Sequence, residues 1–134
     1  MQSLRSATSH RRTAALALLV LLLSFAALAP GGPVENRDFS QLSAATFNGF
    51  NAFLISLGLV GFVVVYFLWN GRAWASWISI LIGWAYVIVV TLDLGKVFPR
   101  SPDPTGLPLG LIMIADAILA LYVITCAHKA LGHL

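Results

Sequence analysis

The sequence is poor in charged residues and in cysteine, and each scarcity excludes a class of protein. Only 10% of its 134 residues are charged, whereas a soluble domain carries about 25%. An ordinary soluble domain is therefore excluded, and so is a disordered chain, which needs low hydrophobicity. The single cysteine, Cys126, excludes an intramolecular disulfide and a CxxC redox site.

Histidines at membrane depth, basic runs and clustered carboxylates are also missing. His10, His128 and His133 lie outside the apolar segments, so we do not expect a haem held between helices. No metal-ligand spacing and no phosphate-binding glycine loop occurs, so the sequence predicts no metal and no cofactor. No Lys/Arg run exceeds Arg11-Arg12, which argues against a nucleic-acid partner. Without a catalytic constellation, we do not expect an enzyme.

Long apolar segments dominate what is present. Hydrophobic residues make up 59% of the chain, and the mean hydropathy is +0.89. Four segments stand out, at about residues 13–29, 50–69, 73–95 and 107–127. The last three reach the roughly 20 residues that cross a bilayer as a helix, and the first is at the short limit. We predict one all-α domain over residues 1–134, a bundle of four transmembrane helices with up-down topology and the lipid bilayer as its partner.

Basic residues predict the orientation of these spans. One side would carry five basic residues and no acid, namely Arg5, Arg11, Arg12, Arg72 and Lys129. The other side mixes three basic residues with four acids. Because Lys and Arg are enriched in cytoplasmic loops, we expect both termini in the cytoplasm. The predicted location is a bacterial-type inner (cell) membrane.

The first span has a second interpretation as a signal peptide. Basic residues precede it, and Ala27-Leu28-Ala29 matches the small-residue pattern of a cleavage site. However, its apolar run is slightly longer than the usual 7–15 or so residues, and Pro30 would directly follow the cut. We expect residues 1–29 to be retained, with cleavage as the alternative.

The two outer loops, 30–49 and 96–106, carry different signals. In the first, residues 30–33 (Pro-Gly-Gly-Pro) stop the first helix. Asp38-Phe39-Ser40-Gln41 is typical of a capping box with Asp38 as the N-cap. The apolar stretch from Leu42 to Phe53 is then either an interfacial helix or an extension of the second span. Prolines at positions 99, 102 and 104 make the second loop stiff.

Asp116 is the most informative residue because it lies near the midpoint of the last span. An ionised carboxylate there costs about 2.5–3.5 kcal/mol, so Asp116 is expected to face the bundle. Depth matching places Ser24 and Trp84 beside it as hydrogen-bond partners. A packing acid is favoured over a proton or cation site, because no second ionisable residue shares its depth. An Asp116→Asn variant distinguishes the two, since an amide keeps hydrogen bonds but cannot exchange a proton.

One face of the third span is small and polar. Helical spacing aligns Ser76, Ser79, Gly83, Tyr86, Val90 and Asp93. A close helix contact is the favoured interpretation, and the wall of an outward-opening cavity is the alternative. Asp93 is expected to pair with Lys96. Together with Asn48 and Asn51 from the second span, these two would line an outer vestibule.

These patterns predict where the protein sits better than what it does. We expect a structural or accessory subunit that packs with itself or with a partner membrane protein, because four short helices bury a thin core. The alternative is a small proton- or cation-coupled transporter or channel subunit that uses Asp116. The remaining candidates for a ligand or ion are Trp84, Ser24, Asp93 and Asn51.

Overall fold

Four long helices form the computed structural model, which describes residues 2–28, 35, 37–99 and 101–132. They are α1 (Gln2–Ala27), α2 (Ala44–Trp69), α3 (Ala73–Leu94) and α4 (Leu107–Leu131). Each helix is long and apolar enough to cross a membrane. The all-helical class is confirmed, and the chain has the make-up of a multi-pass membrane protein.

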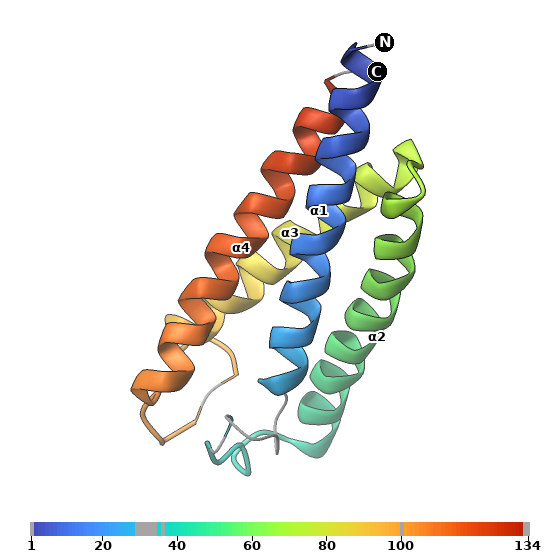
Figure 1. Cartoon of the computed structure of the whole chain (residues 1–134). Helices are drawn as coiled ribbons and strands as arrows, with labels where there is room; N and C mark the ends of the chain where they lie inside the picture. The colour runs from blue at the N-terminus through green and yellow to red at the C-terminus, as the bar shows by residue number, and fades with distance from the viewer. Residues whose placement is uncertain (1, 29–34, 36, 100, 133–134) are drawn as a thin grey trace.

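The first turn of α1 and the last turn of α4 lie together at one end of the bundle (Figure 1). The α2–α3 turn lies there too, because Arg11 Nη1 donates a hydrogen bond of 3.1 Å to the Gly71 carbonyl. Beside it, the Arg12 guanidinium sits 5.0 Å from the Trp69 ring centroid. We call this the turn end. The opposite end carries both long connections and is called the loop end.

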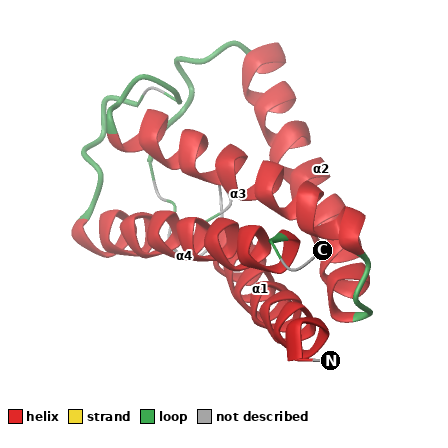
Figure 2. Ribbon diagram, turned by 90° about the horizontal axis from the view of Figure 1, so that it is seen from above, coloured by secondary structure: helices red, strands yellow, loops and turns green. Residues whose placement is uncertain are grey.

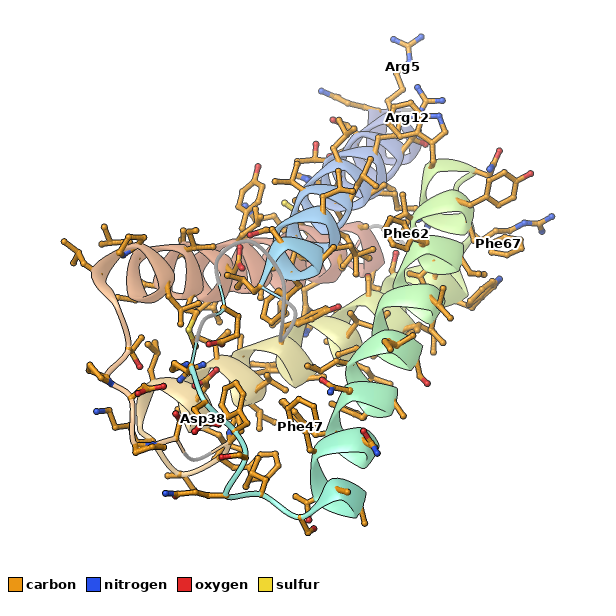
Figure 3. The ribbon with its side chains drawn as sticks, turned by 90° about the horizontal axis from the view of Figure 1, so that it is seen from below. Arg5, Arg12, Asp38, Phe47, Phe62 and Phe67 are labelled. Carbon is orange, nitrogen blue, oxygen red and sulfur yellow. The ribbon has the colours of Figure 1, made fainter. Side chains whose placement is uncertain are left out.

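The side chains differ between the two ends. Figure 3 shows Arg5 and Arg12 at the turn end, whereas Asp38 and Phe47 lie at the loop end. The tight connection at the turn end depends on Gly71, whose φ of 81° is a left-handed conformation that suits glycine. The three residues 70–72 therefore suffice to reverse the chain between α2 and α3.

α2 begins at Ala44, six residues before the predicted start at residue 50 (50 − 44). The apolar stretch after Leu42 therefore extends the second span and is not a separate interfacial helix. Ser43 is the N-cap, and its hydroxyl accepts a hydrogen bond of 3.1 Å from the Thr46 N–H. The predicted capping box at Asp38 is wrong, because no helix follows it. Asp38 instead accepts from the Ser40 N–H at 2.9 Å within a turn.

α1 is also longer than predicted, since it begins at Gln2 instead of residue 13. One face of its early, polar turns packs against the bundle, where Ala7 and Arg11 are both buried. The predicted end of this span at Ala29 and the Pro-Gly-Gly-Pro stop at 30–33 fall outside the described residues. Retention of residues 1–29 stays a prediction.

The core is densest toward the turn end and around α1 and α4. α1 contacts both α2 and α4, and α4 contacts α3 along its length. Small and branched side chains fill this contact, among them Ala14, Leu18, Leu21, Ala120, Val123 and Ala127. α2 contributes only three buried residues, Gly61, Val64 and Leu68, all toward the turn end. Figure 2 shows how α2 diverges from α1 toward the loops.

The small, polar face of α3 plays two roles along its length. At Gly83, an added Cβ would come within 2.6 Å of Ile124 Cγ1 and 3.2 Å of the Ala120 carbonyl oxygen. The predicted close helix contact is confirmed there, between α3 and α4. Further toward the loop end, Tyr86, Val90 and Asp93 line a cavity instead.

Candidate functional site

A cavity of about 500 Å³ lies at the loop end, where the helices diverge. Its size falls within the range of small-molecule sites, about 300–1,000 Å³. All four helices and both long connections contribute residues to it. Its walls are mostly apolar and include Phe25, Phe50, Leu54, Phe62, Val90 and Met113. We call it the loop-end cavity.

Polar side chains line this cavity from three different parts of the chain. Asp93 comes from the last turn of α3, Asn51 from the second turn of α2, and Glu35 from the α1–α2 connection. Deeper in the cavity, the Tyr86 ring packs against Phe25 with its centroid 4.3 Å away. The cavity is therefore amphipathic, with long apolar walls and a charged region near the loops.

Arg37 joins the two carboxylates of this region into one cluster. Its Nε and Nη2 donate to Glu35 at 2.8 and 2.6 Å, and its Nη1 and Nη2 donate to Asp93 at 2.7 and 3.0 Å. The side chains of Glu35 and Arg37 are buried, with 5% and 6% of their surfaces exposed, and that of Asp93 is largely buried, with 14% exposed. Hydrogen bonding to Glu35 raises the pKa of Arg37 above its ordinary value, and Asp93 adds to this against the opposing effect of burial.

The cluster has structural and electrostatic consequences. It fastens the α1–α2 connection to the end of α3, across 56 positions of sequence. It also contains two carboxylates and one guanidinium, so it carries one net negative charge. Buried charges are tolerated when they are paired and hydrogen-bonded, as they are here.

Asp116 lies on α4 inside the bundle, with only 3% of its surface exposed. Its carboxyl shares a hydrogen bond with the side chain of Ser24 on α1. One of its carboxyl oxygens, Oδ2, is buried without a hydrogen-bond partner among the described residues. The predicted orientation of Asp116 toward the bundle is confirmed, and of its two predicted partners the structure places Ser24 beside it.

A family model described as a domain of unknown function, DUF8051, matches residues 10–133. The chain belongs to the DUF8051 family. The match takes in all of α2, α3 and α4, most of α1, and every residue of the charged cluster. No curated protein and no solved structure matches the chain.

Two predicted contacts of this DUF8051 domain are wrong. Trp84 is 48% exposed on the outside of α3 and does not meet the buried Asp116. The buried face of α3 passes through Gly83, and the next residue is turned about 100° away from it. Asp93 pairs with Arg37, not with Lys96. The helix ends at Leu94, so the helical spacing that would bring Lys96 beside Asp93 is broken.

The predicted outer vestibule is only partly assembled. Asp93 and Asn51 share the loop-end cavity, whereas Asn48 and Lys96 are exposed and do not line it. Sequence reasoning missed Glu35 and Arg37, the other members of the charged cluster. The sequence around them shows only an acidic and a basic residue two positions apart in a loop. It contains no feature that indicates a partner on α3.

Proposed function

We propose that the protein spans a bacterial-type inner (cell) membrane with the turn end in the cytoplasm. The turn end carries Arg11, Arg12 and Arg72 close to one another around the α2–α3 turn. The described acids outside the spans all belong to the loop end. An excess of Lys and Arg at the cytoplasmic side is the usual determinant of orientation.

Cysteine labelling tests this orientation. In a Cys126→Ala background, single cysteines replace Ser40, Ser101, Arg72 or Gly132, and whole cells are treated with an impermeant thiol reagent. We expect labelling at 40 and 101 but not at 72 and 132, because only the loop end faces outward. The reverse pattern would overturn the orientation.

We propose further that the protein binds a lipid-sized amphipathic molecule in the loop-end cavity. The observation that carries this proposal is the amphipathic character of the cavity itself: about 500 Å³ with apolar walls and a buried charged cluster near the loops. A molecule with an apolar chain and a polar head matches both parts. Sites of this kind rely on apolar burial for affinity and on few polar groups for orientation.

The position of α2 provides a route into the cavity from the membrane. Ile55, Leu59 and Phe62 line the cavity, yet each keeps 42–64% of its surface exposed. Between Ala44 and Val60, α2 has no fully buried residue. A molecule dissolved in the hydrocarbon can therefore reach the cavity beside α2 without crossing a polar barrier.

Filling the cavity tests the proposal. Gly58 lines it, and a Cβ added there would meet nothing within 4 Å. A Gly58→Phe variant is expected to reduce labelling of the cavity walls by a hexadecyl alcohol with a mid-chain diazirine. Crowding of the bound chain by about 1–3 kcal/mol corresponds to a loss of about 5- to 150-fold.

The matched control is Gly49→Phe. Gly49 is also on α2 and also meets nothing within 4 Å, but it does not line the cavity. Both proteins are reconstituted in phosphatidylcholine nanodiscs, irradiated, and mapped by peptide mass spectrometry. Equal labelling of the cavity walls in the two variants would refute binding in the cavity.

A second candidate function is an accessory subunit that packs with itself or with a partner membrane protein through α2. The observation that favours it is the bare apolar side of α2, where Phe53, Val60 and Val63 are each about half exposed. Native mass spectrometry of protein released from mild detergent separates the candidates. A monomer with a lipid-sized adduct favours the cavity, whereas an oligomer or a protein complex favours the subunit.

A further inference from the structure

The charged cluster limits which polar heads the loop-end cavity accepts. We propose that its ligand carries a hydrogen-bond-donating head, a protonated amine or a hydroxyl, and that amphiphiles with an anionic head are rejected. This inference rests on the proposed function of the cavity, and it adds the chemical class of the ligand. It follows from three features: the commitment of Arg37, the free capacity of Asp93 and the surrounding charge.

Arg37 is already committed to carboxylates. A guanidinium has five N–H donors, and four hydrogen bonds join this one to Glu35 and Asp93. An anionic head that sought Arg37 would have to displace a buried carboxylate from it. The displaced carboxylate would then be left as an uncompensated buried charge, which is strongly unfavourable. Arg37 lies behind the two wall carboxylates and does not itself line the cavity, so it is not available to a phosphate or a sulfate.

Asp93 retains accepting capacity. A carboxylate offers about four lone-pair sites, and Glu35 accepts three hydrogen bonds from Arg37 whereas Asp93 accepts two. Asp93 is also the more exposed of the two carboxylates, at 14% against 5%. Because both carboxylates line the cavity, an N–H or O–H of a ligand can donate to Asp93 without breaking the cluster.

Among the residues that the structure describes, the charges around the cluster do not reverse its sign. Two further acids occupy the same end, where the Asp38 N–H donates to Asp103 Oδ2 at 2.7 Å. Lys96 is exposed and does not line the cavity. The remaining polar wall residue of the region, Asn51, is neutral and can both donate and accept. Donor heads thus meet a favourable field, and anionic heads meet an unfavourable one.

Three photoactivatable probes test this selectivity. They share one hexadecyl chain with a mid-chain diazirine and differ only in the head, which is a primary amine, a primary alcohol or a sulfate. Each is added to the protein in phosphatidylcholine nanodiscs, and labelling of the cavity walls is measured above the Gly58→Phe background. We expect strong labelling by the amine, clear labelling by the alcohol, and labelling at background level by the sulfate.

A Glu35→Gln variant tests the cause. Gln can still accept from Arg37, but the cluster loses its net charge, so the preference for the amine over the alcohol should fall about tenfold. The matched control is Asp103→Asn, which removes the same unit of charge from an exposed residue outside the cavity wall. It should leave the preference unchanged.

The outcomes separate this inference from the proposed function. If the sulfate labels the cavity as strongly as the amine, the inference is wrong although the cavity still binds amphiphiles. If no probe labels above background, the proposed function itself fails. An equal fall in Glu35→Gln and Asp103→Asn would assign the selectivity to the general charge of the loop end and overturn the role of the cluster. The ranking in the wild-type protein decides the inference even if Glu35→Gln does not fold.

Discussion

An Arg37→Met variant is expected to lose about 3–5 kcal/mol of unfolding free energy. The substitution keeps an unbranched apolar stem but removes the guanidinium that holds Glu35 and Asp93. Both carboxylates would remain largely buried with no compensating cation, and this is among the most costly single changes in a protein. The measurement is unfolding of the purified protein in mixed micelles, titrated with sodium dodecyl sulfate.

Two further variants make this result specific. Lys96→Met removes the same charge from an exposed position at the loop end, and it should change stability by no more than about 0.5 kcal/mol. Adding Glu35→Gln and Asp93→Asn to Arg37→Met should recover part of the loss, because the uncompensated charges are gone. If Arg37→Met were no less stable than Lys96→Met, the cluster would have no structural role.

Gly83→Ala should lose about 1–3 kcal/mol of unfolding free energy, although it adds a single methyl group. The new Cβ would lie 2.6 Å from Ile124 Cγ1 and 3.2 Å from the Ala120 carbonyl oxygen. The second of these is backbone, which cannot move aside as the end of a side chain can. Separation of α3 from α4 is the remaining way to relieve the contact.

The control for this variant is Gly58→Ala. Both glycines lie inside helices, so the gain in helix propensity from Gly to Ala is shared. A Cβ at Gly58 meets nothing within 4 Å, so Gly58→Ala should be neutral or slightly stabilising. Both are measured by the same detergent titration. Equal stability of the two variants would show that α3 and α4 pack less tightly than the structure has them.

Helices and their buried faces were predictable because they depend on local pattern. Apolar length located all four helices, and the spacing of small residues on the third span identified the face that meets α4 at Gly83. Matching residues by their depth along the spans also correctly predicted that Ser24 lies beside Asp116. Matching residues by depth does not show which way each helix is rotated about its axis. It therefore also predicted Trp84 as a partner of Asp116, although Trp84 faces outward.

The charged cluster was not predictable, because its pairing is set by how the chain folds back on itself. Arg37 and Asp93 are separated by 56 positions and by all of α2. The sequence predicted Lys96, three residues away, as the ion-pair partner of Asp93, but α3 ends between these two residues. The start of α2 was also mispredicted: Ser43 is the N-cap, and Phe39, which follows Asp38, is buried beside the loop-end cavity before the helix begins.

The placement of α1 between α2 and α4 has a consequence for biosynthesis. The ribosome completes α1 first and α4 last, yet these two helices share an extensive contact. Until α4, which begins at Leu107, has been synthesised, the alanine and leucine side chains of α1 that contact it are uncovered. Ser24 also lacks its partner Asp116. When α4 emerges, Asp116 meets a hydroxyl that is already in place, which lessens the penalty of bringing a carboxyl into hydrocarbon. The packing of α1 is therefore complete only after the last helix, α4, has been synthesised.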